Sequence, residues 1–576
     1  MVNQIKANYR VFLSLGQARL RGQQHQARRS ADVTARSKVN FVAIESSGIL
    51  FGFLLRLALP HSLNKPTWRL LYCLVLGITF LLFMIGKSTW VVLLQVLLCY
   101  VIMKYFPQRH MQLIVFFLAL GYMLILYVVR FMKNTDMLCY DETFPLMVTT
   151  QKVTTLAFGL SDWHLMQKGK KMGTERQKWA VRKMPGLLEY LAFTLSFQGV
   201  LAGPFCHYNL YRAFIEGNTK ARLSEETEHP VRYEDDPSTC LRTVMTKVFA
   251  VAFWTCMTGW VKPLYPETLN ADPAFIASHG FLFRVVYLYV STFLNRCKYF
   301  VTWILADAVY NASGLGYKGK DESSNSDAVY NASGLGYEGK DENGKPRWTG
   351  MTNVFVIKLE TASSLKIYLD NWNIMTTHWL RHVCYTRAPF MNTLLTFILS
   401  ALWHGIHAGY YITFIAAAFF VLAARKMRAT VRPMFQGSRW SRVVYDMMTT
   451  LATHLSMPFL VFSFLIHDLQ AIWQFHKSFY FAVYIIVLSI CIALPSRKRA
   501  SPGASSPKKE PAEAGDKKLV SDDNAQHVQQ QQQQQQQKHH NGNNNMQHHT
   551  LGAAGDAFSE QDAGVIRRGV DSTQMT

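Results

Sequence analysis

The chain has 576 residues, of which 49% are hydrophobic and 17% are charged, and its formal net charge is +23. Soluble domains carry about 25% charged residues, so this composition excludes an ordinary soluble protein and predicts an all-α, polytopic integral membrane protein. A basic chain also suggests nucleic-acid binding. We expect no nucleic-acid partner, because the positive charge falls between apolar segments, where the positive-inside rule places it.

The N-terminal segment, residues 1–40, is basic and polar and lacks a short apolar core with a small-residue cleavage site. We therefore expect no cleavable signal peptide and a cytosolic segment that precedes the first membrane helix. The nine cysteines are scattered and include no CxxC pair. This spacing favours reduced, buried side chains over a disulfide or zinc framework.

Apolar segments follow one another through residues 41–496, which we interpret as one membrane domain. A span needs about 20 residues, so we predict about 10 to 12 transmembrane or re-entrant helices around a chamber. Two segments, 70–86 and 88–103, are separated by one lysine and predict either a tight hairpin or one long bent helix. Two others, 144–160 and 299–310, are weakly apolar and are candidates for re-entrant segments.

Basic residues set the expected orientation of these segments. Arg497, Lys498 and Arg499 follow the last span and predict a cytosolic C-terminal tail. The basic segments 168–183 and 425–442 are placed in the cytosol by the same rule. Residues 497–576 are rich in Ser, Pro, Gln and His, a composition typical of a disordered tail.

A tandem duplication occupies residues 307–346, where the sequence of 307–317 recurs unchanged at 327–337. Two copies are too few for a solenoid, so we predict that one copy packs and the other bulges. Each copy contains an Asn-Ala-Ser sequon, at Asn311 and Asn331. The sequence does not decide whether either is glycosylated.

The most informative stretch lies between residues 370 and 411. From Pro389 to Ala424 there is no Lys, Arg, Asp or Glu, yet His404 lies in the middle of this run. An ionisable group inside a membrane segment is expensive and is a functional candidate by default. An imidazole has an ordinary pKa of about 6.5 and can act as a general base on a hydroxyl at cytosolic pH. The alternative is a hydrogen-bonded core histidine.

Asn373 precedes this run and is the second candidate, because its amide can stabilise an oxyanion or orient a histidine. Asn371 competes with it, and either asparagine could instead be a helix cap. His378 and His382 are four residues apart, but no acidic residue lies between them, so we expect no metal site. No GxSxG motif supports a serine nucleophile.

These residues resemble the membrane-bound O-acyltransferase family, and within it the lysophospholipid acyltransferase branch. The resemblance rests on Asp370–Tyr385, on 396–405 with Trp403-His404-Gly405, on Gly409–Tyr411, and on Gln151–Phe158, Gln198–Pro204 and Tyr211–Gly217. It covers residues 40–495. The duplication and the glutamine-rich tail depart from the family pattern.

The resemblance implies a chamber open to cytosolic acyl-CoA and to a lysophospholipid in the bilayer, with His404 and Asn373 as catalytic residues. Asn371, Trp372, Trp403 and Arg381 are the candidates for substrate binding. Acyl-CoA is then a co-substrate, no cofactor or metal is needed, and the expected location is the endoplasmic reticulum membrane.

The resulting hypothesis is transfer of an acyl group, by preference unsaturated, to the sn-2 hydroxyl of a lysophospholipid with an ethanolamine, choline or serine headgroup. Two alternatives stay open. One is an acyltransferase with a protein or sterol acceptor. The other is a transporter in which His404 relays protons.

Overall fold

The computed structural model describes residues 35–60, 63, 65–133, 140–217, 237–316 and 348–495. The chain divides into two units, Met1–Arg497 and Lys498–Thr576, and every described residue belongs to the first. The predicted tail 497–576 and most of the predicted basic segment 1–40 lie outside these ranges. The first described helix, Ala35–Ala58, begins inside the latter segment.

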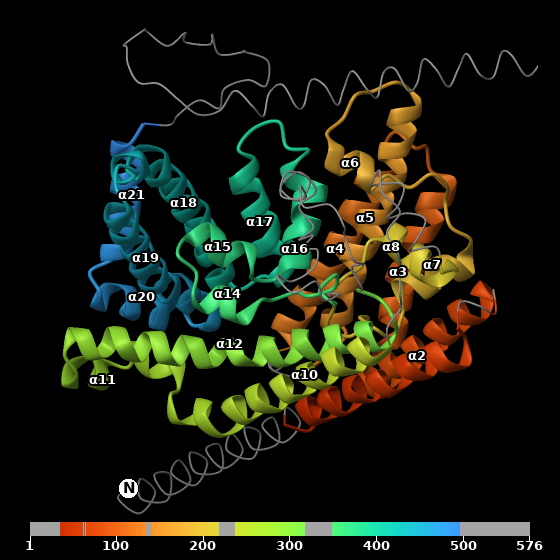
Figure 1. Cartoon of the computed structure of the whole chain (residues 1–576), viewed down its shortest axis with the longest axis horizontal. Coiled ribbons are helices and arrows are strands. Elements are labelled where there is room, and N and C mark those ends of the chain that lie inside the picture. The colour runs from red at the N-terminus through yellow and green to blue at the C-terminus, as the bar shows by residue number, and fades with distance from the viewer. Residues whose placement is uncertain are drawn as a thin grey trace, which may run out of the picture. The chain divides into compact units, whose positions relative to one another are not determined.

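The described residues form helices and turns, with no strand among them (Figure 1). The helices of 17 or more residues are Ala35–Ala58, α2 (Pro66–Ile85), α3 (Thr89–Tyr105), α4 (Met111–Met132), α5 (Thr143–Gln167), α10 (Pro237–Cys256), α12 (Phe281–Ala312), α18 (Ala408–Thr430) and α19 (Arg439–Leu465). The shorter ones are α6 (Thr174–Lys178), α7 (Leu187–Thr194), α8 (Tyr208–Glu216), α11 (Pro273–Ser278), α14 (Val356–Glu360), α15 (Leu365–Asp370), α16 (Ile374–Leu380), α17 (Asn392–His404), α20 (Leu469–Ser478) and α21 (Ala482–Ala493).

Six helices in the described part of the chain are long and apolar enough to cross a membrane. The number is seven if α20 and α21, which meet at 75°, form one broken span. The prediction of an all-α, multi-pass membrane protein is confirmed. The predicted 10 to 12 segments also included helices that are too short or too polar to pass the same test, such as α5, α12 and α17.

Five apolar segments differ in detail from their predicted bounds. Segments 70–86 and 88–103 form one helical stretch, Pro66–Tyr105, which is interrupted by the 3₁₀ turn Gly86–Ser88. Segment 299–310 and most of segment 276–294 lie in the single helix α12, which begins at Phe281 and continues without a break through the polar residues between them. The segment predicted at 408–424 continues to Thr430, so Arg425 and Arg428 of the basic segment 425–442 belong to helix α18.

Helix α5 lies at the centre of the N-terminal half and is buried on all sides, which explains its weak apolar pattern. Its polar side chains have partners inside the protein. Gln151 donates to Thr376 (3.0 Å), and Thr154 accepts from the indole of Trp379 (2.9 Å). Both partners belong to α16, so α5 fixes the helix that follows Asn373.

The first copy of the duplication is described as far as residue 316, and it packs as predicted. Lys247 Nζ contacts Asp307 Oδ2 and Asn311 Oδ1, each at 2.6 Å, and Tyr310 donates to the carbonyl of Pro204 (2.9 Å). Asn311 is fully buried, so its amide is inaccessible to glycosylation in the folded protein. The second copy, with Asn331, lies outside the described residues.

Candidate active site

His404 is the last residue of α17, and its ring lies among aromatic side chains. Phe414 stacks on the imidazole at 5.1 Å between ring centroids, and Phe464 meets it edge-on at 5.0 Å. Tyr410 lies 5.9 Å away. No hydrogen bond to this imidazole is recorded from any described residue, and the side chain is half-buried. Both ring nitrogens therefore remain available to a substrate.

The chain changes direction directly after His404. Gly405 has φ +131°, a conformation that favours glycine, and a Cβ there would also meet Tyr410 and Tyr127 at 3.5 to 3.6 Å. The next helix, α18, begins at Ala408. The Trp-His-Gly sequence thus ends α17 and begins a tight turn, so the imidazole of His404 lies at a helix terminus.

Trp403 holds the end of α17 in place. Its indole Nε1 donates to the carbonyl of Met147 in α5 (3.0 Å), and its ring lies 5.8 Å from that of Trp379. Its own carbonyl accepts from the hydroxyl of Tyr127 (3.3 Å). Trp403 was predicted to bind substrate, and the structure places it as a buried contact between α17, α5 and α4.

Asn373 immediately precedes α16 and has a left-handed backbone, with φ +47° and ψ +52°. Asparagine tolerates this conformation better than most side chains. Its carbonyl accepts from the N–H of Thr377 (3.0 Å), while its side chain makes no cap to its own helix. The side-chain amide is therefore free to take another role.

The buried residue Asn353 supplies the missing cap and also contacts the amide of Asn373. The backbone oxygen of Asn353 accepts from the N–H of Ile374 (2.9 Å), and its Oδ1 accepts from the N–H of Met375 (2.9 Å). Its Nδ2 donates to Oδ1 of Asn373 (3.1 Å). Sequence analysis missed Asn353, because nothing in the chain pattern reveals a cap supplied from another segment.

The other predicted substrate-binding residues lie in different surroundings. Asn371 donates to the carbonyl of Ile367 (2.8 Å) at the end of α15. Trp372 packs against aromatic residues of α12, at 4.9 Å from Trp303 and 5.7 Å from Tyr299. The two asparagines that competed in the sequence are thus separated: Asn371 completes a helix end, while Asn373 is held by Asn353.

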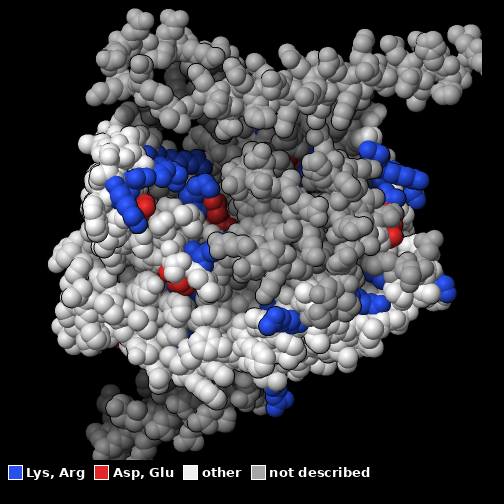
Figure 2. Space-filling model, in the orientation of Figure 1, with Lys and Arg blue, Asp and Glu red and all other residues white. Residues whose placement is uncertain are grey.

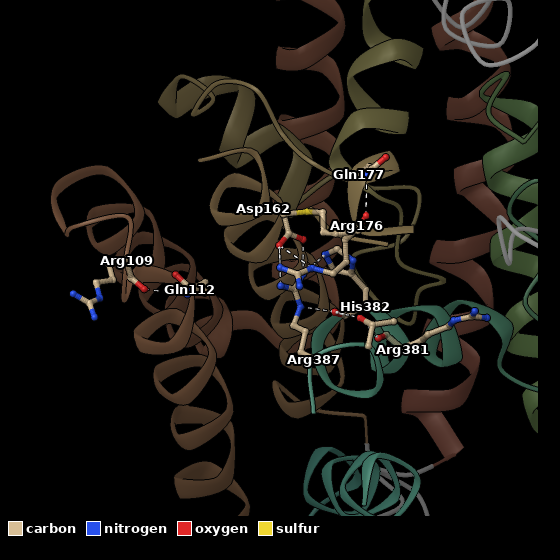
Figure 3. A network of polar contacts seen from close by, with 10 residues as sticks. Arg109, Gln112, Asp162, Arg176, Gln177, Arg381, His382 and Arg387 are labelled. Atoms are coloured by element: carbon tan, nitrogen blue, oxygen red, sulfur yellow. Dashed lines mark hydrogen bonds and ion pairs between the residues drawn. The ribbon is translucent and has the colours of Figure 1, made fainter. Parts of the chain in front are cut away.

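Arg381 lies at the exposed edge of a network of charges between α5, α6 and the turn Arg381–Tyr385 (Figure 3). Asp162 is fully buried and accepts from Arg387 at 2.9 and 2.6 Å, and also from Arg176. Arg381 pairs with Glu175 (2.7 Å). These pairs fix the segment that follows α16 against α5, so Arg381 has a partner inside the protein.

The carboxylates of this network have opposite pKa shifts. Burial raises the pKa of Asp162, but the hydrogen bonds from Arg387 and Arg176 outweigh it, and the pKa is lowered from its ordinary 3.8. Burial raises the pKa of Glu175, and Arg381 offsets part of the rise. The two arginines consequently stabilise the charged form of Asp162.

His378 and His382 form no metal site in the described part of the chain, where no group of three or more potential ligands is close enough to hold an ion. His382 is fully buried, and its carbonyl accepts from Arg387 (2.7 Å). Burial, followed by the charge of Arg387, lowers its pKa to about 3, so the imidazole is neutral.

The two predicted catalytic residues lie on neighbouring helices. Asn373 precedes α16 and His404 ends α17, and these helices pack against each other. No hydrogen bond joins Asn373 to His404 among the described residues. An imidazole without a recorded hydrogen bond and an amide held by Asn353 are thus found on adjacent helices. Groups of these kinds can act as a general base and as a donor to an oxyanion.

Comparison with known proteins identifies the class. The family model for MBOAT, the membrane-bound O-acyltransferase family, matches residues 137–462. The chain belongs to this family, and it is therefore an acyltransferase enzyme of the membrane.

Three relatives cover most of the chain. Membrane-bound glycerophospholipid O-acyltransferase 1 of Mus musculus is 35% identical over 80% of this chain and 89% of its own length. Membrane-bound glycerophospholipid O-acyltransferase 2 of Homo sapiens is 32% identical over 80% of this chain and 85% of its own. Lysophospholipid acyltransferase of Schizosaccharomyces pombe is 29% identical over 74% and 80%, respectively.

Proposed function

We propose that this protein is an acyl-CoA-dependent lysophospholipid acyltransferase that acts in phospholipid remodelling in the endoplasmic reticulum membrane. The acceptor is the free sn-2 hydroxyl of a lysophospholipid with an ethanolamine, choline or serine headgroup, and the acyl group is by preference unsaturated. The names of the relatives support the acceptor class. The donor, the acyl preference and the location rest on the family resemblance.

The observation that carries the proposal is the state of His404. The imidazole ends α17 within a predominantly aromatic shell, and no described residue hydrogen-bonds it. A structural histidine in these surroundings would be expected to have a polar partner, because unpaired polar groups in apolar surroundings are costly. An unpartnered imidazole is instead suited to receive a proton from a substrate.

The reaction needs one proton acceptor and one donor to the developing oxyanion. His404 takes the proton of the acceptor hydroxyl while the hydroxyl oxygen attacks the thioester carbonyl carbon. The carbon–sulfur bond then breaks, and the imidazolium returns its proton to the leaving CoA thiolate. The products are a diacyl phospholipid and CoA, and no covalent enzyme intermediate is required.

Asn373 is proposed to donate to the oxyanion, for a reason that lies in Asn353. Oδ1 of Asn353 accepts from a backbone N–H, so its other terminal atom must be the NH₂ group. That NH₂ donates to Asn373 and requires an oxygen there. The NH₂ group of Asn373 is left without a recorded partner in the described structure, which favours a donor role over the orienting of His404.

The test is acyl transfer from labelled oleoyl-CoA to a panel of lysophospholipids, in membranes that contain wild type, His404→Ala or His110→Ala at equal expression. His110 is an exposed histidine outside the site and serves as the matched control. Transfer by wild type and the control, but not by His404→Ala, supports the proposal, and the panel identifies the headgroup. The proposal would be refuted if the wild type transferred acyl groups only to sterol or protein acceptors. It would also be refuted if the wild type showed no acyl transfer but did transport a solute across the membrane.

A further inference from the structure

Three arginines line a hollow at the C-terminal end of α18. The hollow has a volume of about 580 Å³, and Arg425, Arg428 and Arg432 are its charged lining residues, with Ala429, Pro433 and Gln436 completing it. We call it the arginine pocket. Figure 2 shows basic side chains gathered on this face of the molecule, over the region that Figure 1 labels α18.

The pocket follows from the extension of α18 beyond its apolar part. Arg425 and Arg428 lie three residues apart near the end of α18, which places them on one face of the helix. Arg432, four residues further on, begins the 3₁₀ turn Arg432–Phe435 that follows the helix. Like charges at this spacing repel one another. A bound anion would relieve that repulsion, so the spacing favours occupation by a group with more than one negative charge.

The three arginines have no carboxylate partner among the described residues, in contrast to the arginines of the charge network beside α5. Arg176, Arg387 and Arg381 are tied to Asp162 or Glu175, whereas no ion pair is recorded for the pocket arginines. In the described part of the chain, the one side-chain hydrogen bond recorded for these arginines runs from Arg425 Nη1 to the hydroxyl of Thr393 (3.0 Å). The charge of the pocket is therefore available to a ligand.

The contact with Thr393 relates the pocket to the candidate active site. Thr393 lies in the first turn of α17, and His404 is the last residue of the same helix. At a rise of 1.5 Å per residue, the helix between them spans about 17 Å. The pantetheine arm of coenzyme A has the reach of four to five extended residues, roughly 15 Å. A phosphate group in the pocket thus lies at a suitable distance for a thioester near His404.

We propose that the arginine pocket binds the phosphate groups of the CoA part of the acyl donor. This inference rests on the proposed function for the identity of the donor. Arg428 and Arg432 contact the phosphates, and Arg425 joins them while bound to Thr393. Guanidinium groups suit this task, because their paired N–H donors match phosphate oxygens. The same chemistry could come from an anionic lipid headgroup, and the test below separates the two sources.

The first measurement is equilibrium binding of CoA, 3′-dephospho-CoA and pantetheine to the full-length protein in nanodiscs of neutral lipid. It uses the His404→Ala background, so binding is read without turnover. We expect R428Q/R432Q to weaken CoA binding by about tenfold or more, since hydrogen bonds to charged groups are strong. Binding of pantetheine, which has no phosphate, should not change. R439Q/R442Q removes the same charge from exposed residues outside the pocket and should bind CoA as the parent does.

The second measurement is transfer kinetics with His404 intact. R428Q/R432Q should raise the KM for oleoyl-CoA about tenfold at unchanged kcat. The KM for oleoyl-pantetheine should be that of wild type. The KM for oleoyl-CoA should rise with salt in wild type and less steeply in the variant, because salt screens exposed charges.

Several results would overturn the inference. If R428Q/R432Q weakened the binding of CoA and pantetheine equally, the arginines would have a structural role. If it weakened neither, the arginine pocket would not belong to the donor-binding site. An arginine dependence that appears only in nanodiscs with anionic lipid would assign the pocket to a lipid headgroup. Arginine-dependent CoA binding without transfer to any lysophospholipid would support the pocket and refute the proposed acceptor instead.

Discussion

The contact between Asn353 and Asn373 predicts that the substitution Asn353→Asp lowers the rate of acyl transfer while the protein still folds. In Asn353→Asp, a carboxylate oxygen still accepts from the N–H of Met375, and a negative charge at the start of α16 is favourable. The lost group is the NH₂ that donates to Asn373. A second acceptor now faces Oδ1 of Asn373, so the Asn373 amide is expected to turn and present its NH₂ to the carboxylate.

The expected changes in stability and in kcat follow from the reorientation of the Asn373 amide. The stability change is small, about 1 kcal/mol, because one hydrogen bond is exchanged for another. The NH₂ of Asn373 no longer points to the reacting carbonyl, and loss of one oxyanion donor costs about 100- to 1000-fold in kcat. We expect kcat to fall by about 100-fold with little change in KM, since the pocket arginines and the acceptor contacts are untouched.

The assay is steady-state transfer from oleoyl-CoA, with the thermal midpoint of unfolding measured on the same samples. Asn392→Asp is the matched control. Asn392 only accepts, from the N–H of Thr393 (2.8 Å), and a carboxylate can do the same at the start of α17. A kcat for Asn353→Asp within threefold of wild type, at equal expression, would refute the donor role of Asn373.

Three further predictions concern stability and the duplication. Asp162→Asn leaves Arg387 without its buried charged partner and should destabilise the protein by about 3 kcal/mol. The pKa of Asp162 is lowered in the folded state, so this loss of stability should persist above about pH 4. It should disappear as the pH falls further and Asp162 of the wild type becomes protonated. Gly409→Ala would place a Cβ 2.1 Å from the carbonyl oxygen of Ser463, and we expect a loss of at least about 1 to 3 kcal/mol. Deletion of residues 318–337 removes one repeat length and should leave activity unchanged.

Each of these has its own measurement. For the Asp162 variant, unfolding midpoints are compared with wild type from pH 3 to pH 7; a difference that grows towards low pH would contradict the assigned charge. For Gly409→Ala, the control is Gly121→Ala, where a Cβ meets nothing within 4 Å. For the deletion, loss of transfer would show that residues outside the described ranges take part in the fold or the site.

The membrane class could be predicted from the sequence, and His404 and Asn373 could be proposed from it, because both steps depend on local pattern. A long run without charged residues predicts membrane helices. His404 is conspicuous within this run because placing an ionisable side chain in a membrane segment costs free energy. The bounds of α12 could not be predicted in the same way. Its polar residues, Asn295, Arg296 and Lys298, interrupt the apolar pattern, yet Arg296 lies inside the protein and pairs with Glu360 (2.9 Å).

The supports of the site depend on contacts between distant residues, and sequence pattern does not report these. Asp162 and Arg387 meet from positions far apart in the chain. Asn353 caps a helix that begins after residue 373, in place of the side chain that would cap it from within. The residue pattern alone left two candidate asparagines, and the family resemblance favoured Asn373. The placement of Asn353 adds a structural difference, because it contacts the side chain of Asn373 and no contact between it and the side chain of Asn371 is recorded among the described residues.

The left-handed backbone of Asn373 gives a reason for this division of labour. An asparagine in an ordinary N-cap conformation would direct its side-chain oxygen to the first N–H groups of α16. With φ at +47°, Asn373 is turned away from them, and Asn353 satisfies two of those groups instead. The backbone strain is small for asparagine. Its effect is to keep the amide of Asn373 out of the helix cap, at the start of a helix that packs against α17.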